Sequence, residues 1–267
     1  MTPPDLNVLL PVASRVARLS GDAILEIYKT DFDVTTKADT SPLTEADLAS
    51  QRHIAELARL TPEIPLLSEE SAEVPYATRR TWRSFWLVDP LDGTKEFVKR
   101  NGEFTVNIAL IEDGRPVLGV VHAPDLNLTY AAADGHGASR WEGDAEPEPI
   151  RTSAPESGRL TVVASRSHSN EASERFLERL RRDHPVDLTS KGSSLKICLV
   201  AEGSAHLYPR IGPTMEWDTA AAQVIVEEAG GVMIRLDGGG PLRYNKEDLR
   251  NPHFVVAYGA AAPGMPT

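Results

Sequence analysis

The chain contains 267 residues, of which 41% are hydrophobic and 25% charged, and its formal net charge is −11. This is the composition of an ordinary globular protein, and it excludes disordered, collagen-like and coiled-coil classes. Because the phosphate backbone repels a strongly acidic surface, we expect no nucleic-acid partner, and a small anionic ligand would need local positive charge or metal ions.

The first half of the chain is predicted to combine two helices with an antiparallel meander. Apolar residues at steps of three and four predict the first helix. Alternating apolar and polar residues on both sides of Asp113-Gly114, a favoured hairpin turn, predict paired strands. The helices are expected from just after Asp5 to about residue 27 and over 44–60, a polar loop over 71–81, and strands over 64–68, 85–89, 104–112, 115–122 and 128–132.

The second half is predicted to alternate strands and helices. Residues 134–158 are rich in Gly, Pro, Asp and Glu, and we place within them the boundary between two subdomains, 1–145 and 146–267. An α/β half that follows an α+β half is therefore the expected fold class. Beyond the boundary, strands are expected over residues 160–164, 205–209 and 254–258, and helices over 170–182, 195–202 and 219–229.

Cysteine content and hydropathy predict the compartment. Cys198 is the only cysteine, so no internal disulfide can form, which fits a reducing environment. No apolar run approaches the ~18 residues of a membrane span, and the first residues lack the features of a signal peptide. We therefore expect a cytoplasmic protein with no transmembrane segment.

Acidic residues occupy four unusual places, and each place also has an ordinary structural explanation. Asp47 would complete a capping box at the start of a helix. Glu69 and Glu70 would be solvated loop acids. The acids of segment 89–94 would belong to a turn, and Asp218 would cap a helix.

The combination of these acids favours a metal site instead. Asp89 ends an apolar strand and the chain then turns at once, so that Asp89 and Asp92 can converge. Leu91 offers its carbonyl there, and Gly93 allows close backbone approach. Carboxylates held ~4 Å apart repel by roughly 4 kcal/mol at an effective dielectric constant of ~20, unless cations lie between them. Oxygen ligands favour Mg²⁺, and no cluster of Cys and His suggests zinc.

Two or three bound Mg²⁺ ions would give the chemistry of a metal-assisted phosphomonoesterase. Such ions lower the pKa of a bridging water, hold phosphoryl oxygens and neutralise charge on the leaving oxygen. Thr94 lies beside the predicted metal loop and is a candidate to hydrogen-bond the water, and Asp47 is a candidate to accept its proton. This mechanism requires no covalent phosphoenzyme.

Two motifs resemble the signatures of the inositol monophosphatase superfamily. Residues 89–94 read Asp-Pro-Leu-Asp-Gly-Thr, and residues 217–220 read Trp-Asp-Thr-Ala. A nearer resemblance, to bacterial 3'(2'),5'-bisphosphate nucleotidases of the CysQ type, covers nearly the whole chain. It implies a layered α/β/α/β/α sandwich, the fold of inositol monophosphatase and fructose-1,6-bisphosphatase. The segments that carry it are 37–47, 67–70, 86–107, 192–196 and 207–214.

This resemblance implies a reaction and a set of residues. The reaction is the Mg²⁺-dependent, lithium-sensitive hydrolysis of 3'-phosphoadenosine 5'-phosphate (PAP) to AMP and phosphate, which clears a by-product of sulfate assimilation. Asp47 and Thr94 would activate water. The metal ligands would be Glu69, Asp89, the carbonyl of Leu91, Asp92 and Asp218, all but the last in the first subdomain. The substrate would contact Glu69, Leu91, Asp92, Gly93, Thr94, His168, Ser193, Lys196, Arg210 and Asp218.

Substrate choice is expected to depend on the second subdomain. The backbone amides of residues 192–194, just before a helix, would either meet an anion at the positive end of the helix or form an ordinary serine cap. Arg210 lies near the place where inositol monophosphatases have an acidic residue. Together with Lys196, the planar guanidinium group of Arg210, with its paired N–H donors, would suit a second phosphate. His168 resembles a nucleotide-contacting position, and a surface histidine is its other explanation.

The sequence leaves two other functions open. An inositol monophosphatase would prefer a sugar alcohol with a single phosphate, and a metal or nucleotide sensor on the same fold would bind its ligand without releasing phosphate. Asp47 and Thr94 count against the sensor, because a binder needs no water-activating pair. Cleavage of the sulfated nucleotide (PAPS), a monomeric or weakly homodimeric state, and peripheral association with the cytoplasmic face of the inner membrane are left open as well.

Overall fold

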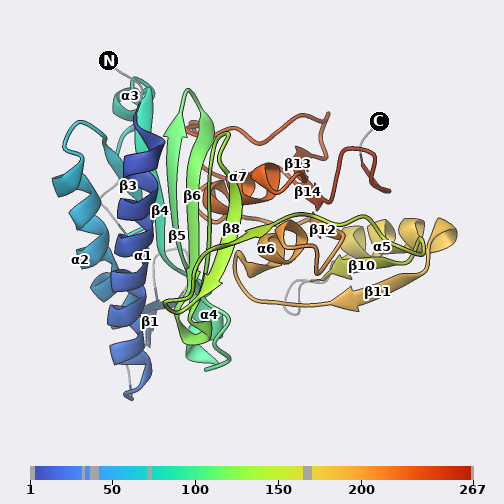
Figure 1. Ribbon diagram of the computed structural model, residues 1–267, viewed down its shortest axis with the longest axis horizontal. Coiled ribbons are helices and arrows are strands. Elements are labelled where there is room, and N and C mark those ends of the chain that lie inside the picture. Colours follow the sequence, from blue (N-terminus) through green and yellow to red (C-terminus); the bar gives the residue numbers. More distant parts are fainter. Residues whose placement is uncertain (1–3, 32–33, 37–41, 71–73, 165–169, 266–267) are drawn as a thin grey trace.

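The protein has five stacked layers of helices and sheets (Figure 1). The computed structural model describes residues 4–31, 34–36, 42–70, 74–164 and 170–265. The layers are, in order, helices α1 (Leu6–Tyr28) and α2 (Glu45–Leu60), a seven-stranded sheet, helices α6 (Leu195–Ala201) and α7 (Ala220–Glu228), a five-stranded sheet, and helix α5 (Glu171–Asp183). This is the predicted α/β/α/β/α sandwich. Within the described residues, no helix is long and apolar enough to cross a bilayer.

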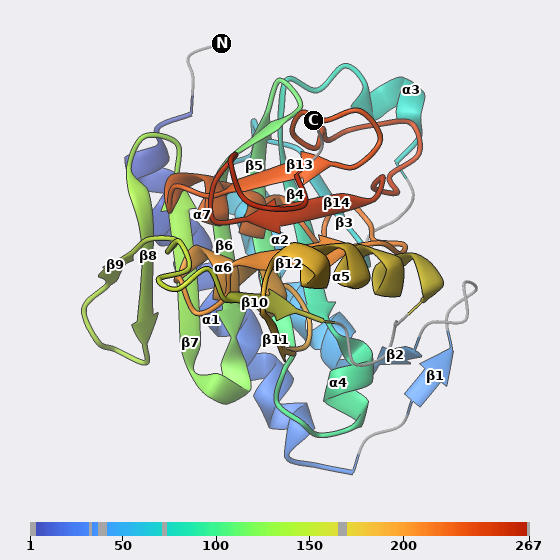
Figure 2. The same cartoon turned by 90° about the vertical axis from the view of Figure 1, so that its right-hand side faces the viewer.

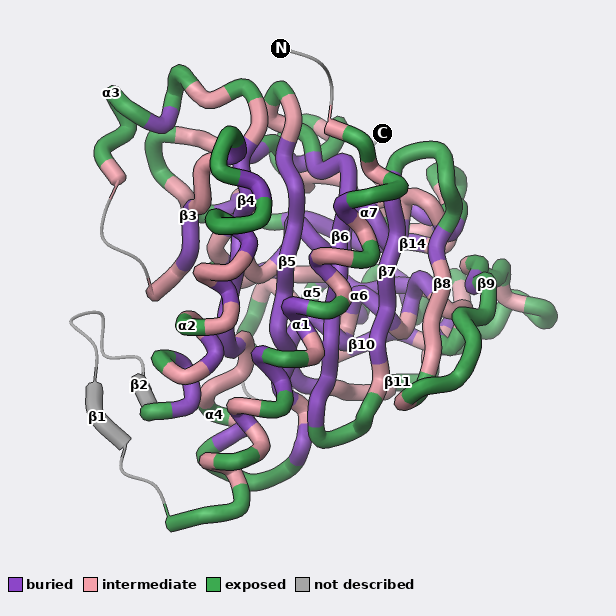
Figure 3. The backbone as a smooth tube through the Cα atoms, turned by 60° about the vertical axis from the view of Figure 1, so that its left-hand side comes forward, coloured by how far each residue is buried: buried purple, intermediate pink, exposed green. Residues whose placement is uncertain are grey.

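The seven-stranded sheet is built on the predicted meander. Asp113 and Gly114, both with positive φ, form the predicted hairpin turn. Every neighbouring pair of strands is antiparallel except the first, which is parallel. The four central strands are buried along most of their length (Figure 3). In spatial order the strands are β3 (Leu66–Ser68), β4 (Ser84–Asp92), β5 (Thr105–Glu112), β6 (Arg115–Ala123), β7 (Leu128–Ala133), β8 (Gly137–Glu142) and β9 (Glu148–Ile150).

Part of the region predicted to be a boundary loop belongs to this sheet. Strands β8 and β9 lie within residues 134–158 and extend the meander beyond β7. Both strands are short and partly exposed, and their sequences show no clear alternation of apolar and polar residues. The glycines and acidic residues around them therefore led to the prediction of a loop. The division at residue 145 stays a prediction, although the first sheet continues past it to Ile150. The sequence also misses four small elements: β1 (Val34–Thr36), β2 (Pro42–Thr44), α3 (Tyr76–Arg79) and α4 (Thr94–Val98).

The five-stranded sheet forms the fourth layer, and α5 covers its outer face (Figure 2). The helices predicted over residues 170–182, 195–202 and 219–229 are confirmed as α5, α6 and α7. The sequence misses β11 and β13, which are only four residues long and partly exposed. In spatial order the strands are β11 (Val186–Thr189), β10 (Leu160–Val163), β12 (Leu207–Arg210), β14 (Phe254–Ala257) and β13 (Val232–Arg235).

A single large core joins the two halves of the chain. Phe85 and Val121 of the first sheet belong to the same buried cluster as Ile225 of α7 and Phe254 of the second sheet. Strand β6 meets α7 very closely, because a methyl group on Gly119 would lie 2.2 Å from the carbonyl oxygen of a residue in that helix. The two halves therefore pack as one body, and their facing edges can build a common site.

His122 lies on β6, beneath helix α1 on the other face of the sheet. The side chain is 5% exposed, and its Nδ1 lies 2.9 Å from the hydroxyl of Thr129. A methyl group on Gly21 of α1 would lie 2.6 Å from the imidazole ring, so the helix packs directly on it. Burial, together with the positive charge of Arg18, lowers the pKa of His122 from 6.5 to about 4.

Acidification is therefore expected to destabilise the protein through His122. Because the folded pKa lies below the ordinary value, the unfolded state binds more protons between pH 6.5 and 4, and stability falls as the pH drops through this window. The expected loss from this group is about 2 kcal/mol between pH ~7 and pH ~5. Urea denaturation at the two pH values measures it. A His122→Asn variant should lose less stability on acidification than the wild type, and an equal loss would contradict the assignment.

Candidate active site

The end of β4 brings Asp89 and Asp92 to one place. The β4–β5 register is irregular between these two residues, so the strand does not continue as a simple ladder. The hydroxyl of Ser50 in α2 donates to the carbonyl oxygen of Pro90 at 2.7 Å and holds the turn against the helix. Gly93 then adopts a φ of 89°, a conformation that favours glycine. The predicted convergence of the two acids is therefore observed.

Asp218 joins these two acids from the second half of the chain. One carboxylate oxygen from each of Asp89, Asp92 and Asp218 lies within 4.8 Å of the others. Each side chain is oriented by a backbone N–H: Leu91 N donates to Asp89 Oδ1 at 3.0 Å, Ser194 N to Asp92 Oδ2 at 2.7 Å, and Met215 N to Asp218 Oδ2 at 2.9 Å. Among the described residues, each carboxylate accepts hydrogen bonds through only one of its oxygens.

The charges of this cluster oppose one another. Burial raises the pKa of Asp89 well above its ordinary value, and the negative charges of Glu69, Asp92 and Asp218 raise it further. Burial and then Asp92 raise the pKa of Asp218 to about 8. Within the part of the chain that the structure describes, no lysine or arginine forms an ion pair with the three aspartates. Three clustered carboxylates, one buried and two partly exposed, with no cation paired directly to them among the described residues, fit a hard divalent cation.

The other predicted residues of the first half surround the cluster. Glu69 follows β3 and is half-buried, and its amide donates to Val88 O at 3.1 Å beside Asp89. Asp47 is 1% exposed in the first turn of α2, one turn before Ser50. Thr94 begins α4, and its hydroxyl donates to the carbonyl oxygen of Leu91 at 3.4 Å. The structure therefore gathers the predicted residues of the first half around one turn.

The turn formed by residues 191–194 attaches the second half to this cluster. Gly192 N donates to Glu103 Oε2 at 2.8 Å, and the hydroxyl of Ser193 donates to the carbonyl oxygens of Asp92 and Glu103 at 3.0 and 2.6 Å. The amides of Gly192 and Ser194 are bonded to protein carboxylates, which leaves of these three only the amide of Ser193 for an anion, and both explanations for residues 192–194 stay predictions.

The side chains of Ser194 and Asn107 have roles in the site that the sequence did not predict. The hydroxyl of Ser194 lies 2.9 Å from Asp92 Oδ2 and 2.7 Å from the carbonyl oxygen of Asp218, so it bridges the two halves. Asn107 on β5 is 1% exposed, and its amide nitrogen donates to this hydroxyl at 2.9 Å. A polar residue in an otherwise apolar strand, at the end of segment 86–107, is the signal that could have identified Asn107.

The chain matches a family model over most of its length. The model of the inositol monophosphatase family covers residues 5–263. The chain belongs to this family. Enzymes of the inositol monophosphatase family are metal-dependent, which agrees with the acidic cluster.

Named relatives of this family give a closer comparison. The chain is 47% identical to the 3'(2'),5'-bisphosphate nucleotidase CysQ of Escherichia coli strain K12, over 93% of this chain and 99% of that protein. It superposes on the crystal structure of CysQ from Bacteroides thetaiotaomicron with a TM-score of 0.82 and 44% identity, covering 92% of this chain and 96% of the other. For the inositol monophosphatase TM1415 of Thermotoga maritima, the TM-score is 0.76 and the identity 26%, with 94% and 92% covered.

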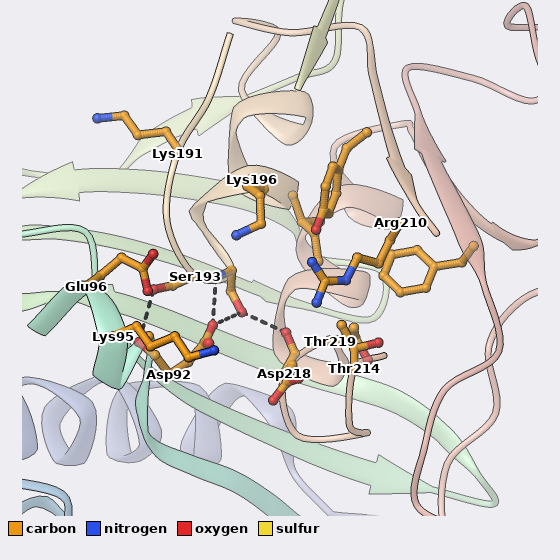
Figure 4. Close-up of a pocket in the computed structure, with 15 residues that line it drawn as sticks. Asp92, Lys95, Glu96, Lys191, Ser193, Lys196, Arg210, Thr214, Asp218 and Thr219 are labelled. Atoms are coloured by element: carbon orange, nitrogen blue, oxygen red, sulfur yellow. Dashed lines mark hydrogen bonds between the residues drawn. The ribbon is translucent and has the colours of Figure 1, made fainter. Parts of the chain in front are cut away.

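In this family member, the acidic cluster opens into a pocket whose opposite wall carries positive charge (Figure 4). Lys196 of α6 and Arg210 at the end of β12 point into the pocket from the side opposite Asp92 and Asp218. Burial lowers the pKa of Lys196 to about 8, against the attraction of Asp92, and the nearby charge of Arg210 lowers it further. Arg210 Nη2 donates to the carbonyl oxygen of Pro213 at 2.7 Å, while its Nε is buried without a partner.

His168 is the one predicted site residue about which the structure gives no information. It lies outside the described residues, so its predicted contact with a nucleotide stays a prediction. Six of the remaining predicted residues line one pocket: Asp92, Gly93, Ser193, Lys196, Arg210 and Asp218. Asp89, Leu91 and Thr94 belong to the turn that carries Asp92, and Asp47 and Glu69 lie on elements packed against that turn.

Proposed function

We propose that the protein is a metal-dependent 3'(2'),5'-bisphosphate nucleotidase that hydrolyses the 3'-phosphate of PAP to give AMP and phosphate. One observation carries the proposal: two members of the acidic cluster, Asp92 and Asp218, line the same pocket as two cationic side chains, Lys196 and Arg210. A cluster of acids suits metal-assisted phosphate chemistry, and a pair of cations suits a second phosphate. The names of the relatives at 47% and 44% identity support the same activity.

We propose Mg²⁺ as the metal, with two or three ions in the site. The ligands would be the carboxylates of Glu69, Asp89, Asp92 and Asp218 and the carbonyl of Leu91, an all-oxygen set. Bound there, the cations would supply positive charge for phosphoryl oxygens and a more acidic water.

The protein's own residues would then position and deprotonate the attacking water. In the proposed reaction, the water oxygen bonds to phosphorus while the bond between phosphorus and the ribose 3'-oxygen breaks, and the 3'-oxygen gains a proton. We assign Thr94 as hydrogen-bond partner of the water and Asp47 as the group that accepts its proton. Asp47 suits this role because it is 1% exposed at the first turn of α2, next to the helix turn that contacts Pro90.

The proposal also covers the contacts of the second phosphate, a second substrate, the compartment and the oligomeric state. The second phosphate of PAP, on the 5'-carbon, would meet Lys196 and Arg210, whose donors face the pocket. PAPS, which carries a sulfate on that phosphate, is a candidate second substrate. We place the reaction in the cytoplasm, with the enzyme acting as a monomer or weak homodimer.

Phosphate release with and without Mg²⁺ tests the proposal. PAP and inositol 1-phosphate are compared at equal concentrations, and a large Mg²⁺-dependent preference for PAP is expected. A preference for inositol 1-phosphate would keep the metal chemistry but overturn the assignment of the second phosphate to Lys196 and Arg210. Binding of PAP without release of phosphate from either compound would instead indicate a sensor.

Ser194→Ala is expected to weaken Mg²⁺ binding about 10- to 100-fold, because the hydroxyl that orients Asp92 and contacts the carbonyl of Asp218 is lost. Calorimetric titration with MgCl₂ measures the affinity directly and does not depend on turnover. Ser204→Ala is the matched control, since that hydroxyl is exposed and bonds only Glu202 among the described residues. Equal Mg²⁺ affinity of Ser194→Ala and the wild type would contradict the assignment.

A further inference from the structure

Asp218 is the one clustered aspartate that comes from the second half of the chain, and it lies between β12 and α7. Thr214, Asp218 and Thr219 of this segment line the pocket (Figure 4). The amide of Met215 donates to Asp218 Oδ2 at 2.9 Å and so orients the carboxylate. The position of Asp218 therefore depends on what holds the peptide group between Thr214 and Met215.

The loop of residues 243–251, between β13 and β14, holds this peptide group. The amide of Asn251 donates to the carbonyl oxygen of Thr214 at 2.9 Å. The peptide group that accepts from Asn251 is thus the one that donates to Asp218. The next peptide group is also held, because Asn251 Nδ2 donates to the carbonyl oxygen of Met215 at 2.7 Å. Asn251 therefore fixes two consecutive peptide groups, one of which carries the donor to Asp218.

The side chain of Asn251 also contacts the residue that follows Asp218. Its Nδ2 donates to the hydroxyl oxygen of Thr219 at 2.9 Å. Asn251 is 8% exposed and Thr219 1%, so water competes little for these hydrogen bonds. One buried amide therefore contacts the chain on both sides of Asp218, at Met215 and at Thr219.

Glu216 and Arg79 fix the loop that carries Asn251. Glu216 is fully buried, and its carboxylate accepts from the amides of Asn245 and Lys246 at 2.6 and 3.0 Å and from Lys246 Nζ at 2.5 Å. Lys246 Nζ also lies 3.5 Å from Asn251 Oδ1. From the first half of the chain, Arg79 of α3 donates to the carbonyl oxygen of Lys246. The loop is therefore held from both halves of the chain, which keeps Asn251 at a defined position.

We propose that Asn251 is a positioning residue for the metal site: it fixes the peptide group that orients Asp218, and thereby sets the affinity of the acidic cluster for a divalent cation. This inference rests on the proposed function, in which Asp218 is a metal ligand. Asn251 lies outside the motifs of residues 89–94 and 217–220, so neither motif indicates it.

Asn251→Ala is expected to weaken Mg²⁺ binding about tenfold, because the amide that fixes Met215 and Thr219 is lost. Calorimetric titration with MgCl₂ measures the affinity without turnover. Half-maximal phosphate release from PAP should likewise need more MgCl₂, and saturating MgCl₂ should restore most of the activity. Recovery by the metal would not follow from a residue that only stabilises the fold.

Asn245→Gly is the matched control, because Asn245 lies in the same loop but its side chain contacts Arg79 rather than the segment of Asp218. Its φ of 68° suits glycine, and its backbone amide keeps the bond to Glu216. We therefore expect Asn245→Gly to bind Mg²⁺ as the wild type does.

Asn251→Asp separates positioning from charge. It keeps the size of the side chain and an acceptor for Lys246, but it places an oxygen against the carbonyl of Met215. An added negative charge by itself would strengthen binding of a cation, whereas loss of positioning weakens it. We expect weaker Mg²⁺ binding.

Each other outcome identifies what has failed. Equal Mg²⁺ affinity of Asn251→Ala and the wild type, or tighter binding by Asn251→Asp, would overturn the inference. An equal loss in Asn251→Ala and Asn245→Gly would overturn it as well, since the loop would then act only through its packing. Absence of Mg²⁺ binding by the wild type would overturn the proposed metal site, and the inference with it. Melting in EDTA shows whether each variant is folded, and Asn251→Asp carries the test if Asn251→Ala is not.

Discussion

Asp89→Asn is expected to abolish phosphate release while making the metal-free protein more stable. The substitution removes a carboxylate at the centre of the cluster, so activity should fall by about 10³-fold or more. It also removes a buried negative charge that burial, Glu69 and Asp92 disfavour. The pKa of Asp89 is raised in the folded state, so its contribution to stability is lost as pH rises through that pKa. At neutral pH the neutral amide is therefore expected to raise the melting temperature of the metal-free protein.

Two measurements check this prediction independently of each other. Phosphate release from PAP in saturating MgCl₂ reports activity, and calorimetric melting in EDTA reports stability. The melting temperature of the wild type should rise on adding Mg²⁺, and that of Asp89→Asn should respond much less. Asp187→Asn is the control, because Asp187 is half-exposed and pairs with Arg159 far from the cluster. Near-normal turnover of Asp89→Asn would contradict the assignment of Asp89 as a metal ligand.

The parts of the fold that the sequence predicts are those with strong local patterns. The hairpin around Asp113-Gly114 combines an alternating apolar pattern with a turn signal, the helix before Gly230 is a run of apolar residues stopped by two glycines, and both are observed. Strand β8 lacks such a pattern: only one of its six residues is buried, and glycines at positive φ lie at its start and on both sides of it. Its place in the sheet is decided by pairing with β7, a long-range contact that a local pattern does not encode.

The residues of the site also separate into those that a local sequence pattern predicts and those that depend on long-range packing. Asp89 and Asp92 are brought together by one turn, so their spacing alone predicts their convergence. Asp218 belongs to the second half of the chain, and its only sequence signal is the motif of residues 217–220. The role of Ser194 depends on contacts with Asp92 and with the carbonyl of Asp218 that exist only after both sheets have packed. The sequence alone therefore identifies the candidate metal-binding acids more readily than the residues that orient those acids.

Arg210→Ala is expected to remove most of the preference for a bisphosphate. The guanidinium group faces the pocket with a buried Nε that has no partner, and a phosphate would provide an acceptor for it. Loss of a charge-assisted pair of hydrogen bonds predicts a fall in kcat/KM for PAP of about 10- to 100-fold. Turnover of inositol 1-phosphate should change far less, because that compound has no second phosphate to contact the arginine.

Arg210→Lys distinguishes the shape of the arginine from its charge. A lysine keeps the positive charge but lacks the planar fork, and it cannot donate to Pro213 and a phosphate in one plane. We therefore expect Arg210→Lys to recover only part of the lost kcat/KM for PAP, with Arg159→Ala, an exposed arginine, as the control. Full recovery by lysine would show that the pocket selects its substrate by net charge. Partial recovery would show that the orientation of the guanidinium group, and hence the residues that fix it, contributes to the choice between one phosphate and two.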